Sequence, residues 1–336
     1  MQQDSTDLKA DRILGGRDAD AVDRHAISVV TMVYKSASFL PEFLRLTRQA
    51  LGAAGFEDYE LVFVNDGSPD DSLDYLLEQR QADNRIRIVD LSRNFGHHRA
   101  ALAGLACADG DLVFLIDCDL EVSPMALVTL AETLRLMSAD VAYGVQESRK
   151  GAFVERIGGH LFWKIFNVLS DTPVPANVLT ERLMTREYKD ALLRLGDRNI
   201  FLAGMMYWAG FRQVGVALQK GQRSGRTTYS FAKRAALLLE AITSFSTVPL
   251  KLVLALGLTL TACSTAFAMF MVLRKLLYPS SLLMGFTTIS VLVIGIGGII
   301  ITLMGVLGLY ISRIFVQTQG RPTYIVRKIH GHRESE

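Results

Sequence analysis

Two aspartates at the end of an apolar run are the residues of this chain best suited to chemistry. Asp117 and Asp119 follow residues 112–116, a run whose length and composition are typical of a buried β-strand. Residues i and i+2 of a strand project to the same side, so both carboxylates can face one hard cation. Mg²⁺ and Mn²⁺ prefer oxygen ligands and commonly take one or two protein carboxylates together with substrate phosphate oxygens. We therefore predict a cation site here, with Cys118 turned into the core; the alternative is a solvated loop.

Polar segments also follow three other apolar runs, at residues 31–36, 65–70 and 92–97. Asp66 is a further candidate acid, placed to hydrogen-bond a nucleoside, although its segment alone would be a turn that caps a helix. No G-x-G-x-x-G follows the first run and no G-x-x-x-x-G-K-[ST] occurs, so the sequence predicts neither a dinucleotide site nor a P-loop. His97 and His98 begin a predicted helix at the same place, where a polar cap is the alternative to a catalytic role.

The predicted elements bring these segments to one edge of a sheet. Strands separated by helices of ~10 to 15 residues indicate a mostly parallel sheet covered on both faces. Ligands of such sheets bind outside the carboxyl ends of the strands, which is where all four polar segments lie. The predicted strands are residues 26–33, 59–64, 86–91, 111–116 and 141–145, and the predicted helices are 39–53, 72–81 and 100–108.

Two long uncharged segments predict membrane-spanning helices. Residues 252–273 and 282–310 contain no Asp, Glu, Lys or Arg, and each exceeds the ~20 residues that cross a bilayer. We place transmembrane helices at 249–274 and 282–311, joined by a tight turn; two buried core helices are the alternative. Basic residues dominate both flanks, so the positive-inside bias predicts a two-span protein of the cytoplasmic (inner) membrane with both termini and the N-terminal domain in the cytoplasm.

The remaining chain divides around these helices. We predict a disordered leader at 1–25 without a signal peptide, an α/β domain at 26–230, a juxtamembrane amphipathic helix at 231–248 and a basic cytoplasmic tail at 312–336. For residues 231–248 a helix packed on the domain is the alternative. Lys and Arg total 36 against 34 Asp and Glu, and this net charge of +2 does not favour nucleic acid as a partner. The three cysteines are widely spaced and predict neither disulfides nor a zinc site.

Taken together, the motifs resemble the family-2 glycosyltransferases of the GT-A fold. Within them they are most similar to the polyisoprenyl-phosphate glycosyltransferases related to dolichol-phosphate mannose synthase and to bacterial undecaprenyl-phosphate sugar transferases. Each shared motif is short, but the joint pattern covers nearly the whole chain except the leader. The motifs are Val33-Tyr34-Lys35-Ser36, Asn65-Asp66-Gly67-Ser68, Ser92-Arg93-Asn94-Phe95-Gly96, Asp117-Cys118-Asp119-Leu120-Glu121 with Pro124, Ser244-Phe245-Ser246, Pro249-Leu250, residues 308–314 and Arg321-Pro322.

The resemblance implies an α/β GT-A domain, with its mostly parallel sheet, that transfers a sugar from a nucleotide-sugar to a polyprenyl phosphate with inversion, for cell-envelope glycans. It implies Mg²⁺ or Mn²⁺ on Asp117 and Asp119, which are also the catalytic residues. The nucleotide-sugar residues that it implies are Thr31, Tyr34, Lys35, Asp66, Ser68, Arg93, Asn94 and Asp117. The implied ligands of the acceptor phosphate are Arg149, Arg156, Arg223 and Arg226, and for each of these arginines a solvated surface position is the alternative.

Several positions depart from the family pattern. Lys35-Ser36 replaces Asn-Glu, Asn65 replaces Asp, Glu121 replaces Gln, and Thr180 stands where the family often has Asp. The half that binds metal and nucleotide is thus closer to the pattern than the half that binds sugar and acceptor. The identity of the sugar, the nucleotide and the lipid is left open.

Other functions are compatible with parts of the sequence. One is a transferase that extends a preassembled lipid-linked glycan. A processive polysaccharide synthase is another, but its Arg-Trp pair does not occur. From a different class, a non-catalytic membrane scaffold or flippase component is disfavoured by the retained acids. A homo-oligomer is compatible with the small residues Ala262 and Ala266, spaced by four in the first long helix.

Overall fold

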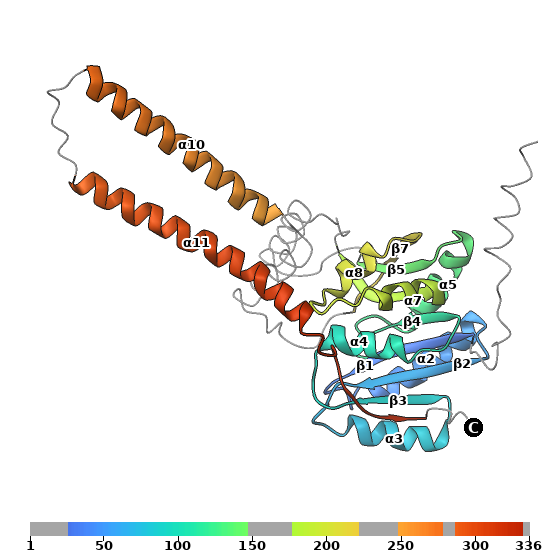
Figure 1. The fold of residues 1–336 in the computed structure, drawn as a ribbon. Helices are drawn as coiled ribbons and strands as arrows, with labels where there is room; N and C mark the ends of the chain where they lie inside the picture. Colours follow the sequence, from blue (N-terminus) through green and yellow to red (C-terminus); the bar gives the residue numbers. More distant parts are fainter. Residues whose placement is uncertain (1–25, 147–176, 222–247, 278–285, 332–336) are drawn as a thin grey trace, which may run out of the picture.

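The computed structural model describes residues 26–146, 177–221, 248–277 and 286–331 (Figure 1). Its first part alternates strands and helices as predicted, with small shifts at the ends of elements. The largest difference from a predicted range is at α4, which begins at His97, where the two histidines were expected to start a helix, and not at residue 100. The elements are β1 (Ile27–Val33), α2 (Leu40–Ala54), β2 (Tyr59–Asn65), α3 (Ser72–Ala82), β3 (Ile86–Leu91), α4 (His97–Ala106) and β4 (Leu112–Leu115).

The described strands form one eight-stranded sheet in the order β7-β5-β6-β4-β1-β2-β3-β8. β4, β1, β2 and β3 are parallel neighbours, whereas β6 lies antiparallel between β4 and β5. The mostly parallel α/β sheet is therefore confirmed. The elements that complete it are α5 (Ala126–Leu136), β5 (Val141–Gln146), β6 (Val178–Thr185), α7 (Arg186–Arg194), α8 (Leu202–Trp208), β7 (Gln213–Leu218) and β8 (Val326–His330).

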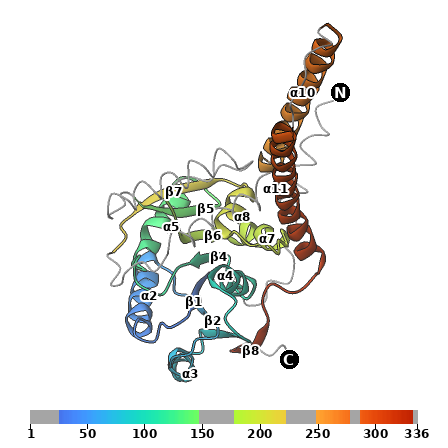
Figure 2. The same ribbon diagram turned by 90° about the vertical axis from the view of Figure 1, so that its left-hand side faces the viewer.

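Apolar side chains pack on both faces of the sheet. β1 and β2 are buried at every position, as expected of central parallel strands. One core cluster joins alternate strand residues such as Val29 and Phe63 to α2 and α5, and a second joins residues such as Val30 and Val64 to α4, α7 and α8. Figure 2 shows these two groups of helices on opposite sides of the sheet. The strands are thus held rigidly, and their carboxyl ends form a fixed edge.

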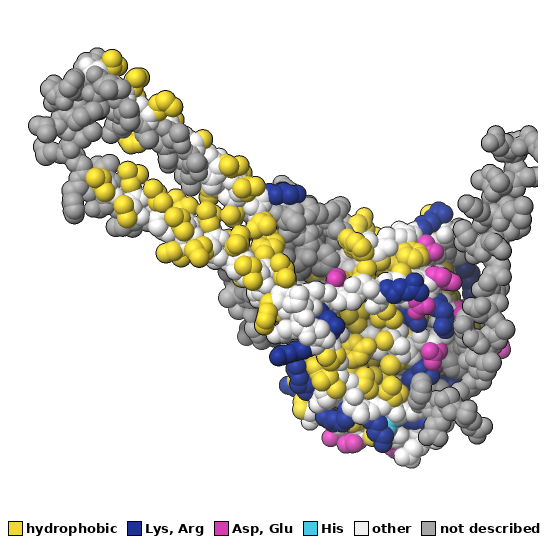
Figure 3. Space-filling view, viewed as in Figure 1, with side chains coloured by type: hydrophobic (Ala, Val, Ile, Leu, Met, Phe, Trp, Pro, Cys, Tyr) yellow, Lys and Arg dark blue, Asp and Glu magenta, His cyan; other side chains and the backbone are white. Residues whose placement is uncertain are grey.

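Two long helices extend together away from the sheet domain (Figures 1 and 2). They are α10 (Val248–Leu277) and α11 (Phe286–Thr318), and apolar side chains cover much of their visible surface (Figure 3). Within the described chain, Ile299–Thr318 is the stretch whose 20 residues are long and apolar enough to cross a membrane, and Leu250–Thr259 is a shorter apolar stretch. Both predicted helices form, while the two-span hairpin stays a prediction.

The carboxyl-terminal segment differs from the basic tail predicted at 312–336. α11 continues past the predicted end at residue 311 to Thr318, and the chain then returns to the domain as β8, antiparallel to β3. The sequence did not predict β8 because this short strand, with two adjacent basic residues, has no clear apolar alternation. Its partner strand also lies more than two hundred residues away in the chain. The predicted leader at 1–25 and all but Val248 of the predicted juxtamembrane helix at 231–248 lie outside the described residues.

Gly104 allows α4 to approach the sheet closely, and replacing it tests how tightly α4 packs there. A methyl group there would lie 2.5 Å from Val30 Cγ1 and 2.8 Å from Val64 Cγ2. We expect Gly104→Ala to lower the free energy of unfolding by about 1 to 3 kcal/mol, because overpacking forces neighbouring side chains to move. Thermal or denaturant unfolding of the full chain in detergent measures this change.

The matched control is Gly52→Ala in α2, where no described heavy atom beyond the helix lies within 4 Å of the added carbon. Alanine is the better helix former, so this variant should gain about 0.4 to 1 kcal/mol. Equal stabilities for the two variants would contradict the close packing of α4.

Candidate functional site

The loops that follow β1, β2, β3 and β4 meet at one edge of the sheet, because these strands are parallel neighbours. Asp117 and Asp119 lie in the turn after β4, and the Asp117 side chain is 29% exposed. Cys118 between them is buried and donates its Sγ hydrogen to the Met32 carbonyl over 3.1 Å. Burial also raises the pKa of this thiol to about 11. The prediction that Cys118 packs in the core is confirmed.

A tight turn holds the second aspartate in place. Leu120 has a left-handed φ of 58°, which reverses the chain directly after Asp119. Asp119 Oδ1 then accepts a hydrogen bond from the Glu121 amide over 3.0 Å. The turn leaves Asp119 Oδ2 free of any described backbone bond, so this oxygen can serve a ligand at the edge of the sheet.

Like charges dominate the electrostatics of this edge. Burial and the neighbouring charges of Asp119 and Glu121 raise the pKa of Asp117 to about 7, and Lys220 opposes the shift. Lys220 Nζ lies 2.5 Å from Glu121 Oε2. Glu181 on β6 is 4% exposed, and burial together with the charge of Asp117 raises its pKa to about 7 as well. Acids concentrated in a partly desolvated place favour a bound cation.

His97 faces this acidic cluster from the first turn of α4. Its Nε2 lies 3.6 Å from Asp117 Oδ1, beyond hydrogen-bonding distance. Burial lowers the pKa of His97, although the charges of Asp119 and Asp66 oppose the shift. The ring is therefore mainly neutral near pH 7, and one nitrogen can accept a bond while the other donates. His98 points elsewhere, with Nδ1 3.4 Å from the Ile200 carbonyl.

Asp66 joins the loop after β2 to the loop after β3. Its carboxylate is buried and accepts the amides of Phe95, over 2.7 Å, and of Gly96, over 2.9 Å. Gly67 has a φ of +61°, and a Cβ there would lie 2.6 Å from the backbone of Arg93 and Asn94. The two loops thus touch through their backbones, and Asp66 has a structural role beside the predicted contact with a nucleoside.

Asp70 organises the outer part of the loop after β2. Its oxygens accept bonds from Ser68 Oγ over 2.5 Å, Ser72 Oγ over 2.6 Å and the Ala37 amide over 3.1 Å. Burial opposes ionisation, but these bonds lower the pKa of Asp70 to about 2. Ser68 Oγ also accepts a hydrogen bond from the Lys35 amide. Lys35 has a left-handed φ of 55°.

The structure brings most of the predicted donor residues to this edge. Tyr34 is 45% exposed, and Lys35, Arg93 and Asn94 are exposed beside it. Thr31 is a correction: it lies inside β1 and is 1% exposed, so it cannot contact a nucleotide from there. The polar segment predicted at 31–36 begins inside the strand, and the Thr31 side chain shares the face of β1 that packs against α2 and α5. The predicted acceptor residues Arg149, Arg156, Arg223 and Arg226 lie outside the described residues.

Sequence reasoning missed Glu181 and Lys220. Their signal was weak, because Glu181 stands next to Arg182 in a strand of mixed composition, and Lys220 follows β7 without any motif. Glu181 lies on β6, which pairs antiparallel with β4, and Lys220 follows β7, which pairs with β5. The sequence does not reveal either pairing.

The described acids suit a cation that takes most of its ligands from elsewhere. No described group of three or more His, Cys, Asp or Glu side chains is arranged to hold a metal alone. Two carboxylates with oxygen donors, completed by phosphate oxygens of a substrate, match the preference of Mg²⁺ or Mn²⁺. The donor set therefore fits such an ion.

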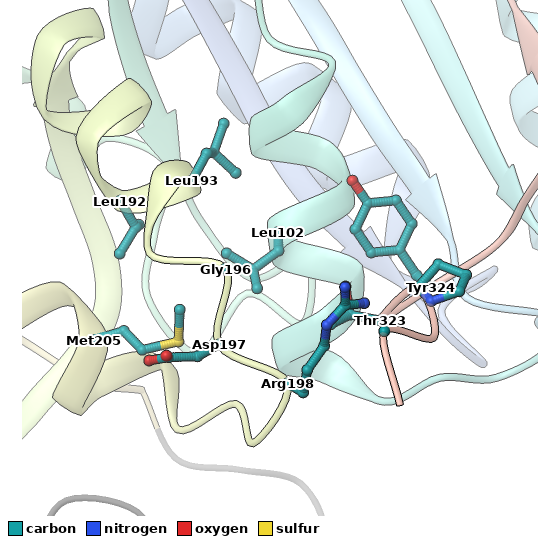
Figure 4. A pocket seen from close by; sticks show the side chains of 11 residues that line it. Leu102, Leu192, Leu193, Gly196, Asp197, Arg198, Met205, Thr323 and Tyr324 are labelled. Carbon is teal, nitrogen blue, oxygen red and sulfur yellow. The ribbon is translucent and has the colours of Figure 1, made fainter. Parts of the chain in front are cut away.

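A separate cavity of about 460 Å³ lies where the segment after α11 meets the domain (Figure 4). Leu102 of α4, Leu192 of α7 and Met205 of α8 line it together with Arg198 and Tyr324. None of the acids at the strand ends borders it. It marks the junction between the long helices and the domain and is distinct from the acidic edge.

Comparison with known proteins agrees with this architecture. The sequence profile described as glycosyl transferase family 2 matches residues 28–201. A Mycobacterium tuberculosis protein described as a glycosyltransferase is 37% identical over 305 residues, or 91% of this chain and 88% of that protein. The SfII prophage-derived bactoprenol glucosyl transferase of Shigella flexneri is 31% identical over 306 residues, or 90% of this chain and 98% of that protein.

Among solved structures, a mannosyltransferase from Pyrobaculum calidifontis in complex with GDP-Man and Mn²⁺ aligns with a TM-score of 0.46. It is 16% identical, and the alignment covers 93% of this chain and 92% of that chain.

The contacts of Asp66 predict a structural effect of its replacement. Asp66→Asn should lower the free energy of unfolding by about 1 to 3 kcal/mol, because the amide NH₂ group cannot accept one of the two backbone bonds. Asp71→Asn is the control: Asp71 is exposed, caps α3 without a side-chain bond, and should change stability by less than about 0.5 kcal/mol. If unfolding in detergent shows no difference between the two variants, Asp66 does not join the loops.

Proposed function

Because this chain belongs to glycosyl transferase family 2, we propose that it transfers a sugar from a nucleotide-sugar to a polyprenyl phosphate at the cytoplasmic face of a membrane, with inversion at the anomeric carbon. That it is a glycosyltransferase follows from the family; the donor, acceptor, metal and membrane face are the proposal. The observation that carries it is the pair Asp117 and Asp119 at the edge of the sheet, beside the exposed donor residues.

The acidic edge supports the donor part of the proposal. Asp117 and Asp119 would hold Mg²⁺ or Mn²⁺, which when bound offsets the charge that grows on the leaving diphosphate. Tyr34, Lys35, Arg93 and Asn94 are exposed around the acids and can contact the nucleotide and its phosphates. Asp66 and Asp70 hold the loops that present them. Positions fixed in this way orient the donor before transfer.

The lipid acceptor is supported by the relatives and by the long helices. Proteins named bactoprenol glucosyl transferase align over 90% of this chain. An alignment of this length must include residues of the long helices as well as the sheet domain. α10 and α11 are largely apolar on the outside, as spans beside a lipid would be. A polyprenyl phosphate is already an anion at neutral pH, so it needs no strong general base, but it does need cations. Arg149, Arg156, Arg223 and Arg226 remain our candidates for that role.

One observation favours a second acceptor class. A hydroxyl group of a preassembled lipid-linked glycan would require a base, and burial, together with the charge of Asp117, raises the pKa of Glu181 to about 7. A carboxylate that titrates there is suited to accept a proton at neutral pH. The two acceptor classes differ in the product that they give.

The proposal predicts transfer by the full chain in membranes supplied with a panel of nucleotide-sugars and polyprenyl phosphate. Mass spectrometry should identify a polyprenyl-phosphate sugar, and EDTA or Asp119→Asn should reduce its formation by at least about a hundredfold, as loss of electrostatic stabilisation typically does. Asp74→Asn, an exposed position in α3, is the matched control and should retain activity. Product that forms only with a glycan-bearing lipid would support the second class, and full activity in EDTA would contradict the metal role.

Proton and metal should compete for Asp117. Its pKa of about 7 means that it is largely protonated below that pH and ionised above it. Mn²⁺ affinity of the full chain in detergent should therefore weaken about tenfold between about pH 8 and about pH 6, because binding must release one proton. Calorimetry without nucleotide measures this, and Asp117→Asn should bind weakly at both values. Affinity that is independent of pH would contradict the assignment of Asp117 as a ligand.

A further inference from the structure

The strand β8 connects the end of α11 to the donor side of the sheet. After α11 ends at Thr318, the chain pairs antiparallel with β3, an edge that would otherwise be open in the described sheet (Figure 1). Ser92, just after β3, donates its amide to the Ile325 carbonyl over 2.9 Å. The last described segment of the chain therefore lies beside the loop that carries Arg93 and Asn94.

An irregularity in this pairing gives Arg327 a special position. Asp90 is opposite Lys328 and Leu91 is opposite Val326, so Arg327 is an additional residue at a β-bulge. Bulges redirect side chains and are frequent near active sites. Here the Arg327 guanidinium donates from Nη2 to the Ser92 carbonyl over 2.7 Å, and its Nη1 lies 3.5 Å from Asp90 Oδ2.

Asp90 connects Arg327 to the loop after β2. Its carboxylate is 5% exposed and accepts Asn65 Nδ2 over 2.7 Å. Asn65 Oδ1 in turn accepts the Ser68 amide over 3.1 Å. A buried carboxylate requires partners, and Arg327 and Asn65 supply one for each oxygen. Arg327 thus reaches Ser68 through two side chains, and reaches Arg93 and Asn94 through the backbone of Ser92.

We propose that β8 positions the nucleotide end of the donor site and that Arg327 is its positioning residue. This inference rests on the proposed function, since it takes the loops at Ser68 and at Arg93 as donor-binding. Arg327 is 61% exposed at its side chain, so its ion pair contributes little to stability by itself. Its contacts instead hold two loops in one arrangement, which reduces the ordering cost when the donor binds. Through β8 the donor site is also tied to the helix α11.

The test uses the full chain in detergent with polyprenyl phosphate and the nucleotide-sugar that the panel selects. Arg327→Ala should raise the donor KM about tenfold, which corresponds to ~1.4 kcal/mol, while kcat at saturating donor and the acceptor KM change by less than about twofold. Arg327→Lys should give an intermediate donor KM, because an ammonium cannot reach both the Asp90 carboxylate and the Ser92 carbonyl as the planar group does. Calorimetry with UDP and GDP should show the same order of affinities.

Lys328→Ala is the matched control. Lys328 is the next residue of β8, is exposed, carries the same charge and pairs with Asp90 only through the backbone. It should leave donor KM and nucleotide affinity as in the wild type. An Arg327→Ala enzyme that behaves like Lys328→Ala, or that loses kcat and acceptor affinity as much as donor affinity, would overturn the positioning role. Wild-type protein that transfers no sugar would instead contradict the proposed function itself.

Discussion

Two carboxylates held close together in a half-buried turn repel each other, and the architecture of the site follows from this constraint. Asp117 and Asp119 are kept together by the end of β4 and the left-handed turn at Leu120. Burial, together with the charge of Asp119, raises the pKa of Asp117 to about 7. Glu121 and Glu181 add to the negative field, and Lys220 offsets only part of it. An edge of this kind favours a divalent ion together with an anionic ligand over either one alone.

The remaining loops supply rigidity for this arrangement. Asp66 holds the loop after β3 through two backbone amides, and Asp70 holds the loops after β1 and β2 through hydroxyl groups and an amide. Asp66 belongs to a motif that resembles a donor-binding motif of the family, and Asp70 follows it, yet the contacts of both aspartates described here are within the protein. Their side chains prepare the shape of the site, and the exposed neighbours are left to meet the ligand.

The long helices and the sheet domain are joined at more than one place. Arg313 of α11 donates to the Asn199 side chain over 3.0 Å, and Gln317 accepts the Arg198 amide over 2.9 Å. The chain then passes the cavity at Tyr324 and enters the sheet as β8. A catalytic domain attached in this way has a restricted orientation relative to its helices. Under the proposed function, such a restriction would hold the site in a set orientation relative to the membrane.

Local patterns in the sequence determined the parallel half of the sheet, the two long helices and the position of Asp117 and Asp119. In these places the structure depends on neighbouring residues, through strand and helix periodicity, although both aspartates lie in the turn after β4 and not in the strand itself. The tertiary structure decided what depends on distant pairing. Thr31 is buried in the core, and Asp66 and Asp70 accept hydrogen bonds from backbone amides of other loops. Glu181 and Lys220 lie near the acids because of the positions of β6 and β7. Part of the predicted basic tail forms the strand β8. Antiparallel and edge strands pair with residues far along the chain, so no local pattern records which charges they bring together.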